Sequence, residues 1–271
     1  MKSLEISFVG AGRVGTAMGR ELSRRGWRVH GYFDIDSESA HTAAKAVPCG
    51  AFETMLKLAR RSDVLFFTVP DGEVARVCEE LGDSGDFRAR FLFHTSGILP
   101  SRVLHLAGLD RAVYSIHPFG GIVPSAENPF AGLFFGCEGD SPAEPIAREI
   151  VADIGGIFVE IDSASKTKYH LSASISANLG FALLEICRGL LENCGISQEN
   201  AIAMTASIAR KAIGNFEQFG FPEGMTGPIV RGDYLTIAQH IVSAEESGNL
   251  GIYLAGIEKI RQMLREKLPK S

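Results

Sequence analysis

Hydrophobic positions in the first 160 residues alternate between two patterns. Short apolar runs are separated by stretches in which apolar residues recur at helical spacing. This alternation is typical of a parallel β-sheet covered by helices, so we predict an α/β fold for this part. The runs predict strands near residues 4–10, 28–34, 63–69, 90–94, 112–116, 132–137 and 157–161. The stretches between them predict helices near residues 13–26, 37–46, 52–60, 72–82, 100–107 and 142–154.

The pattern changes after residue 162, where strand signals end and only helical spacing continues. Ser163 is predicted to cap a long helix that runs to Asn193, and Gly195 to end it. Further helices are predicted over residues 197–217, 233–247 and 249–267, with a loop rich in Gly and Pro at 220–232. We therefore predict two domains without a flexible linker, a sheet domain at 1–162 and an all-helical domain at 163–271.

A glycine-rich turn lies between the first predicted strand and the first helix. Gly10, Gly12 and Gly15 form the pattern G-x-G-x-x-G, with Arg13 and Val14 between the last two glycines. In this pattern the first glycine permits a tight turn, the second admits a pyrophosphate, and the third lets the helix pack on the sheet. The helix N-terminus would face the phosphates. We expect a Rossmann domain in which these five residues bind NAD or NADP; the alternative is a Rossmann fold that has lost its ligand.

The acidic residue after the second strand bears on the choice of cofactor. Asp34 follows Gly15 by nineteen residues, at the end of this strand. A carboxylate there accepts hydrogen bonds from the adenosine ribose and repels a 2′-phosphate, which favours NAD over NADP. In the alternative interpretation, Asp34 or Asp36 caps the next helix. Arg13 could still reach a 2′-phosphate.

Two later turns are candidates for the cofactor wall. Val69 and Pro70 close the strand at 63–69, and Thr95 and Ser96 follow the strand at 90–94. Ligands of such sheets bind beyond the carboxyl ends of the strands, so we expect these four residues to contact the cofactor. His94, by contrast, could be a hydrogen-bonded turn residue.

Charge and cysteine usage limit the possible partners and the compartment. The net charge is −5 and the basic residues are scattered, which argues against nucleic acid. The chain opens almost directly into an apolar strand, and no uninterrupted apolar run approaches the length of a membrane span. We expect a cytoplasmic protein with no membrane or nucleic-acid partner. An odd number of cysteines without a C-x-x-C pair fits reduced thiols: Cys49, Cys78, Cys137, Cys187 and Cys194.

Four polar residues recur at intervals of four on the predicted helix that begins at Ser163. They are Lys166, His170, Ser174 and Asn178. Each interval advances about 40° around a helix, so the four stay within about 120° of one face. If that face lines a cleft, His170 relays a proton, Ser174 and Asn178 orient a carbonyl oxygen, and Lys166 stabilises an alkoxide. Alternatively the face is solvated, and Lys168 could equally be the relevant amine.

A second set of candidates would bind the substrate. Arg231, in the loop that begins at Thr226, suits a bidentate clamp on a carboxylate or phosphate. Asp233 is predicted to cap the next helix, and an Arg231–Asp233 pair is the structural alternative. His240 follows seven residues later on the same helical face.

His117 precedes a proline, which fixes where its imidazole points, and both a substrate-binding and a structural role stay open for it. The candidate histidines lie on separate elements without H-x-x-x-H spacing, so we expect no metal.

Several of these stretches together resemble one family. They are Val69-Pro-Asp71, His94-Thr-Ser-Gly97, His117-Pro118, Tyr169-His170, Asn178, and Thr226-Gly-Pro-Ile-Val-Arg231-Gly-Asp233 with His240 beyond. They resemble Rossmann-like proteins that carry a helical C-terminal domain of unknown function and are regarded as NAD(P)-dependent oxidoreductases. The resemblance covers nearly the whole chain, and T-G-P-x-x-R-G-D is its most specific part. The layout is more distantly similar to pyrroline-5-carboxylate reductase and to the 6-phosphogluconate and 3-hydroxyisobutyrate dehydrogenases, so the helical domain is expected to be of the 6-phosphogluconate dehydrogenase type.

Two departures limit what the resemblance implies. Many relatives have an Arg-containing turn suited to NADP where this chain has Asp34-Ile-Asp36. The hydroxyacid dehydrogenases have Lys and Asn four residues apart, whereas here Lys166 is followed by His170. The resemblance implies dinucleotide chemistry and a homodimer built through the helical domain. It names no substrate.

The function that these patterns favour is hydride transfer between NAD(P)H and a small carbonyl or imine compound that carries an anionic group. The helical domain would exclude water and Arg231 would hold the anion. The alternative is a dinucleotide-binding sensor or regulatory protein without turnover. An enzyme needs a proton donor within reach of the nicotinamide, which His170 would supply.

Overall fold

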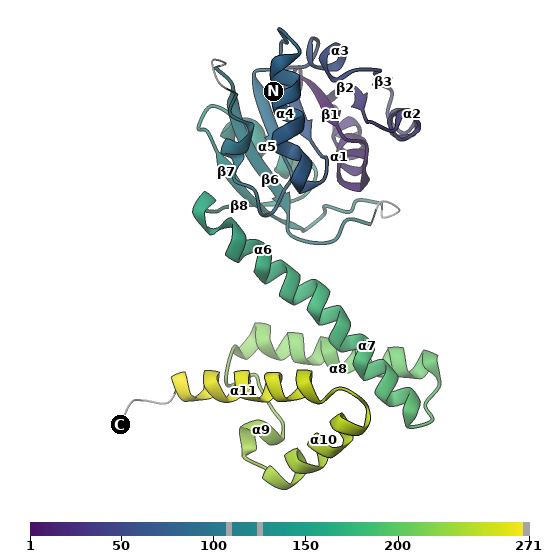
Figure 1. Cartoon of the computed structure of the whole chain (residues 1–271), viewed down its shortest axis with the longest axis vertical. Helices are drawn as coiled ribbons and strands as arrows, with labels where there is room; N and C mark the ends of the chain where they lie inside the picture. Colours follow the sequence, from purple (N-terminus) through teal and green to yellow (C-terminus); the bar gives the residue numbers. More distant parts are fainter. Residues whose placement is uncertain (107–109, 124–126, 268–271) are drawn as a thin grey trace. The chain divides into compact units, whose positions relative to one another are not determined.

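The computed structural model describes residues 1–106, 110–123 and 127–267 (Figure 1). The chain forms two compact units, Met1–Ala177 and Asn178–Ser271. The division therefore falls later than the predicted one at 162/163. The reason is that the first turns of the long helix pack on the sheet of the first unit, where Lys166 is fully buried.

One sheet of eight strands forms the first unit, in the order β3-β2-β1-β4-β5-β6-β7-β8. Strands β1 to β6 are parallel, whereas β7 pairs antiparallel with β6, and β8 runs parallel to β7. The order reverses between β1 and β4, which is the switch point at which Rossmann sheets bind ligands. The strands are β1 (Glu5–Val9), β2 (Arg28–Phe33), β3 (Gly50–Ala51), β4 (Val64–Phe67), β5 (Phe91–His94), β6 (Ala112–Pro118), β7 (Phe134–Gly139) and β8 (Ile157–Glu160).

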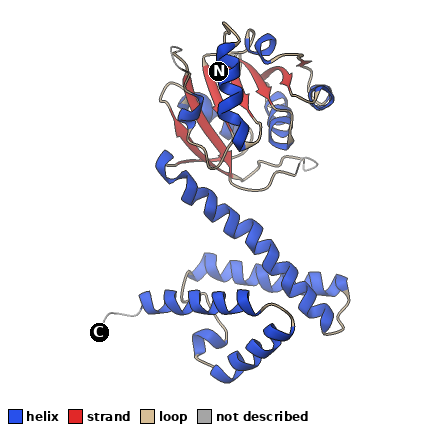
Figure 2. Cartoon of the chain, viewed as in Figure 1, coloured by secondary structure: helices blue, strands red, loops and turns tan. Residues whose placement is uncertain are grey.

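Helices cover both faces of this sheet (Figure 2). The helices of this unit are α1 (Arg13–Arg24), α2 (Ser37–Lys45), α3 (Met55–Ala59), α4 (Val74–Asp83), α5 (Glu144–Asp153) and α6 (Lys166–Ser174), with 3₁₀ turns η1 (Asp71–Glu73), η2 (Ser101–Leu104) and η3 (Ser163–Ser165). Most predicted elements are present. The differences include the short β3, which was not predicted, the reduction of the predicted helix 100–107 to η2, and the cap of the long helix, which is Asp162 rather than Ser163. The long helix also contains a π-turn at Ile175–Leu179, and the predicted loop 220–232 contains a short helix at Pro228–Arg231.

The core of the first unit lies on both faces of the sheet. On one face a row of aromatic rings crosses β2, β1, β4 and β5, with ring centroids 5.2 Å apart for Tyr32 and Phe8, 5.3 Å for Phe8 and Phe66, and 5.0 Å for Phe66 and Phe93. Strands buried on both faces are apolar at successive positions, which explains why their runs are visible in the sequence. The single tryptophan, Trp27, is buried in this core, and its Nε1 donates to the Asp153 carboxylate at 2.7 Å.

The described part of the second unit is entirely helical, as predicted (Figure 2). A π-turn η4 (Ile175–Leu179) joins α6 to α7 (Gly180–Asn193) and contains the boundary between the units; α8 (Gln198–Phe219), α9 (Pro228–Arg231), α10 (Tyr234–Glu246) and α11 (Leu250–Lys267) follow. Ser197 caps α8 and Asp233 caps α10, each accepting a hydrogen bond from a backbone N–H of the first turn. These caps fix where the helices begin.

The helical stretch Ser163–Asn193 is long and apolar enough to cross a membrane, by length and composition alone. No uninterrupted apolar run of that length was expected, and polar residues such as Lys166, His170 and Asn178 interrupt this stretch. The same stretch buries Lys166 against the sheet, and Arg188 forms ion pairs with Glu185 and Glu192. None of its most apolar window is buried within the described chain.

Candidate functional site

The three glycines of the first turn have different surroundings. Gly10 has a φ of +103°, and a Cβ there would lie 2.7 Å from the Thr68 carbonyl group. A Cβ at Gly15 would lie 2.6 Å from the Gly10 carbonyl oxygen, so only glycine lets α1 pack this closely. Gly12, the N-cap of α1, has open space around the position of a Cβ. This geometry suits a phosphate that approaches the backbone at Gly12, where exposed Arg13 and half-buried Val14 begin the helix.

Asp34 ties the end of β2 to the glycine turn. Its Oδ2 accepts from the Ala11 N–H at 2.7 Å and its Oδ1 from the Asp36 N–H at 2.9 Å. Asp36 is the N-cap of α2, and hydrogen bonds from the Ser39 hydroxyl and the Glu38 N–H lower the pKa of its carboxyl group. Of the two acidic residues, Asp36 therefore caps the helix, and Asp34 is held beside the glycine turn.

The turn after β5 is built around Ser96, which is buried. Its backbone N–H donates to His94 Nδ1 at 3.1 Å, and its Oγ accepts from the N–H groups of Ile98 at 3.3 Å and Leu99 at 3.1 Å. The Ser96 hydroxyl is therefore engaged within the turn, whereas we had expected Ser96 to contact the cofactor. Neighbouring Thr95 is half-buried.

His94 is the hydrogen-bonded turn residue of the alternative considered above. Burial, with the nearby positive charge of Lys166, lowers its pKa to about 3. After β4, Val69 is half-buried and Pro70 is exposed.

Lys166 lies beneath the turn that follows β5, with 1% of its surface exposed. Its Nζ donates to the Ser96 carbonyl oxygen at 3.0 Å and to Ser115 Oγ, and lies 3.5 Å from Glu138 Oε1. Burial lowers the pKa of Lys166 to about 8, although Glu138 opposes the shift. Because an ammonium group has three donors, and three acceptors surround this one, the structure leaves Lys166 no donor for a substrate alkoxide. This placement corrects the predicted role of Lys166; exposed Lys168 is not part of this cluster.

Glu138 is the partner that the sequence did not predict. It is the last residue but one of β7 and is buried. Its carboxylate accepts from the Ser101 N–H at 2.6 Å and from Ser101 Oγ at 2.8 Å. The predicted strand ended at residue 137, so Glu138 lay just beyond it and gave no signal of burial.

Two histidines meet above the same turn. The ring centroids of His117, on β6, and His170, on α6, are 5.9 Å apart. His117 Nδ1 lies 2.9 Å from the Tyr169 hydroxyl, which also accepts from the Gly136 N–H at 3.2 Å. A Cβ on Gly97 would lie 2.6 Å from His170 Cδ2 and 2.7 Å from His117 Nε2. Burial, with the charges of Lys166 and His170, lowers the pKa of His117 to about 4, so its imidazole is neutral at pH 7.

The other predicted residues lie elsewhere. Ser174 is half-buried on α6, one turn after His170. Asn178, Thr226, Arg231 and His240 belong to the second unit, and all four are exposed.

The loop before α10 uses Asp233 as a cap. Its carboxylate accepts from the Thr236 N–H at 3.1 Å and from Thr236 Oγ1 at 2.7 Å. Hydrogen bonds from Thr236 and, to a lesser extent, the positive charge of Arg231 lower the pKa of Asp233, although no ion pair joins Arg231 to Asp233 within the described ranges.

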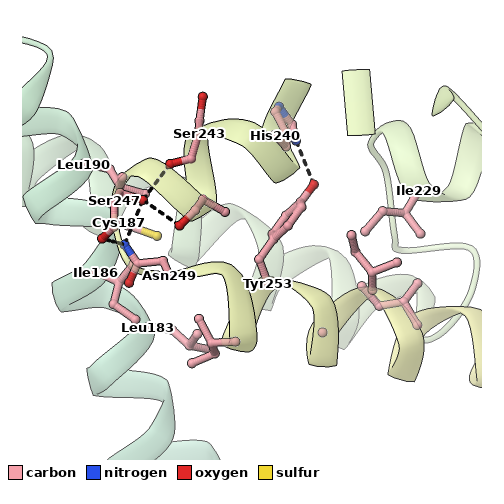
Figure 3. Close-up of a pocket in the computed structure, with 15 residues that line it drawn as sticks. Leu183, Ile186, Cys187, Leu190, Ile229, His240, Ser243, Ser247, Asn249 and Tyr253 are labelled. Carbon is pink, nitrogen blue, oxygen red and sulfur yellow. Dashed lines mark hydrogen bonds between the residues drawn. The ribbon is translucent and has the colours of Figure 1, made fainter. Parts of the chain in front are cut away.

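His240 lines a cavity of the second unit that Ile229 of this loop also lines (Figure 3). The cavity has a volume of about 460 Å³, and its lining is mostly apolar. His240 Nδ1 lies 2.8 Å from the Tyr253 hydroxyl, and Leu183, Leu190 and Ile229 are among the residues that line the space.

Two family models together cover most of the chain. One is a Rossmann-like domain, which matches residues 1–118, and the other is a domain of unknown function, DUF2520, which matches residues 133–258. The second match includes β7, α5 and β8, so the family boundary precedes the boundary between the compact units. No curated protein matches the sequence.

Solved structures share this fold over nearly the full length. A Thermotoga maritima protein is 23% identical with a TM-score of 0.74, over 97% of this chain and 99% of that one. A Bacteroides fragilis protein, a candidate NADP oxidoreductase, is 19% identical with a TM-score of 0.78, over 96% and 99%. Pyrroline-5-carboxylate reductase of Coxiella burnetii is 15% identical with a TM-score of 0.62, over 97% and 98%. The chain therefore joins a Rossmann-like domain to a DUF2520 domain, in the fold of pyrroline-5-carboxylate reductases, as the resemblance implied.

Proposed function

We propose that this protein is an NAD(P)-dependent oxidoreductase that transfers a hydride to or from a small carbonyl or imine compound carrying an anionic group. One observation carries the proposal. At the carboxyl edge of the sheet, the open glycine turn after β1 and the His117–His170 pair lie on opposite sides of the switch point between β1 and β4. Dinucleotides bind across this point in Rossmann sheets.

The residues present fit a dinucleotide. Gly12 leaves room for the pyrophosphate at the start of α1, and Asp34 lies at the end of β2, where an adenosine ribose would bind. The nicotinamide half then extends over the ends of β4 and β5, toward Val69, Pro70 and Thr95. When bound, the cofactor supplies or accepts the hydride.

The two imidazoles would serve different purposes. A neutral His117 can donate or accept a hydrogen bond at a reacting oxygen or nitrogen without carrying charge. His170, on the helix beside it, is the proposed proton relay. Ser174 and Asn178 are proposed to orient the substrate, and Arg231, with Thr226 nearby, to bind its anionic group. A contact between His240 and substrate has less support, because its imidazole pairs with Tyr253 beside an apolar cavity.

Asp34 also leads us to propose that NAD binds more tightly than NADP. Its carboxylate is fixed by two backbone N–H groups and would repel a 2′-phosphate. The fold relatives whose names mention NADP are only 19% and 14% identical to this chain. We expect NADH to bind about tenfold more tightly than NADPH in fluorescence titrations, and Asp34→Ser to remove the difference. A wild-type preference for NADPH would contradict this assignment.

The activity itself is tested by a screen of small keto acids, imino acids and hydroxy acids with both cofactors. Turnover with a compound that carries a carboxylate or phosphate would support the proposal. Tight cofactor binding without any turnover would favour a sensor.

The five free cysteines support a cytoplasmic site of action, which fractionation of cells that express the protein would test.

A further inference from the structure

The turn at residues 96–101 is held at both ends by one buried ion pair. At its start, the Ser96 carbonyl oxygen accepts from Lys166 Nζ at 3.0 Å. At its end, the Ser101 N–H and hydroxyl donate to the Glu138 carboxylate at 2.6 and 2.8 Å. The ammonium and carboxylate groups are 3.5 Å apart, so the pair closes a ring of contacts around the turn.

A buried pair of this kind is costly unless every polar group has a partner. Lys166 and Glu138 are 1% and 8% exposed, so both charges have lost most of their hydration. Replacing such a pair by apolar residues is often neutral or stabilising, which makes a pair a weak device for stability alone. Buried polar networks can instead fix one arrangement of the backbone, because every donor and acceptor must be matched at once.

The turn lies beside the cofactor in the proposed enzyme. It follows β5 on the side of the switch point opposite Asp34, where the nicotinamide half of a dinucleotide would lie. It also carries Gly97, whose missing side chain leaves room for the His117 and His170 rings. A small movement of the turn would therefore change both the cofactor wall and the spacing of the two imidazoles.

We infer that Lys166 and Glu138 are positioning residues that fix the turn 96–101, and with it Gly97, at the nicotinamide side of the cofactor site. This inference rests on the proposed function. Neither residue contacts cofactor or substrate in this role. Both act through the backbone of the turn.

The test compares the full-length protein with Lys166→Met, Glu138→Gln and the double variant. Lys166→Met alone leaves an unpaired buried carboxylate and should lower the thermal midpoint, which the double variant should largely restore. NADH binding should nevertheless stay about tenfold weaker in the double variant, because the Ser96 carbonyl group has lost its charged donor. Binding of ADP-ribose, which lacks the nicotinamide, should stay within about twofold of wild type, since it uses only the glycine turn and Asp34.

The matched control is Glu21→Gln, which removes a buried carboxylate from α1 that pairs with Arg24 at 3.0 Å. It should change the thermal midpoint without changing the ratio of NADH to ADP-ribose affinity. Recovery of NADH affinity together with stability in the double variant would overturn the inference. So would a parallel loss of NADH and ADP-ribose binding.

Amide hydrogen exchange separates this inference from the proposed function. The Ile98 and Leu99 N–H groups donate to Ser96 Oγ, so they should lose protection in the double variant and keep it in Glu21→Gln. If the wild-type protein binds neither ligand, the proposed function fails while this measurement still decides whether the pair holds the turn. Unchanged protection in the double variant overturns the inference.

Discussion

The two compact units differ sharply in how they bury apolar side chains. In the first unit, helices on both faces of the sheet cover two large clusters of buried apolar residues. Among the described residues beyond Ala177, the buried hydrophobic ones are Ala201, Ile237 and Ile257. Phe181, on α7, is 71% exposed, and Ile208, on α8, is 72% exposed. The first unit buries many apolar side chains within one chain, whereas the second leaves large apolar side chains exposed, a pattern typical of surfaces that bind a partner.

The largest expected effect tests whether the exposed apolar side chains of the second unit are covered by a second copy of the chain. We predict a homodimer in which α7 contributes to the interface with Phe181, Leu184 and Leu191. Light scattering should give about twice the mass of 29.2 kDa, and Phe181→Glu should reduce it to the mass of one chain. Ile35→Glu changes a residue of the first unit that is 97% exposed and should leave the dimer intact. A monomeric wild-type protein at micromolar concentration would show that the second unit needs no second copy.

A pair of glycine substitutions sharpens the picture of the first unit. Gly12→Leu projects into open space, so the fold should survive while binding of both NADH and NADPH is abolished. Gly10→Ala meets the Thr68 backbone at 2.7 Å with a φ of +103°, so it should lower the thermal midpoint by about 5 °C or more. Calorimetry and cofactor titration measure the two effects. Normal NADH affinity in Gly12→Leu would show that the pyrophosphate does not bind at this turn.

The third prediction assigns different kinetic effects to the two units. His170→Ala, in the first unit, should lower kcat about 100-fold, the usual scale for losing a positioned acid or base. Arg231→Ala, in the second unit, should mainly raise KM, because it removes a contact felt equally in the ground and transition states. Neither should change NADH affinity greatly. Steady-state kinetics with an active substrate are the measurement, and unchanged kcat and KM in both variants would refute the site.

The smallest expected effect concerns pH. His94 and His117 have folded pKa values of about 3 and 4 against an ordinary value of 6.5. The folded state therefore binds fewer protons than the unfolded state below pH 6.5, and the free energy of unfolding should fall as the pH drops toward 4. His94→Asn should reduce the change in urea midpoint between pH 7 and 4.5, and His117 and His30, whose pKa values burial also lowers, should supply part of what remains. His240→Asn is the matched control, because His240 is exposed. If this variant reduces the change in urea midpoint as much as His94→Asn does, the burial of His94 is not the cause.

Most of the fold could be predicted because its signals are local. Strands buried on both faces appear as apolar runs, and caps such as Asp36 and Asp233 mark helix starts. The spacing of Lys166 and His170 correctly put them on one helix. Helical spacing predicts which face of a helix a residue occupies, but it does not predict how deeply that residue is buried. It therefore could not show that Lys166 is buried beneath the turn that His170 approaches.

The partners of this buried lysine were harder to predict. Glu138 and Ser101 are separated from Lys166 by 28 and more residues, and only the antiparallel placement of β7 brings them together. That strand runs against the direction of β1 to β6, which a pattern of alternating strands and helices does not reveal. The boundary between the units was missed for a related reason, since one continuous helical stretch crosses it.

The position of the single tryptophan makes the first unit optically distinct. Trp27 is buried in the sheet domain, with its indole N–H bonded to Asp153. Intrinsic emission excited at the red edge of the tryptophan band therefore reports on the environment of the first unit, whereas far-ultraviolet circular dichroism sums the helices of both. Recording the two signals in one denaturation experiment would show whether the units unfold together, without a label or a truncated chain. Transfer of excitation from this indole to a reduced nicotinamide would likewise originate from one known place in the molecule.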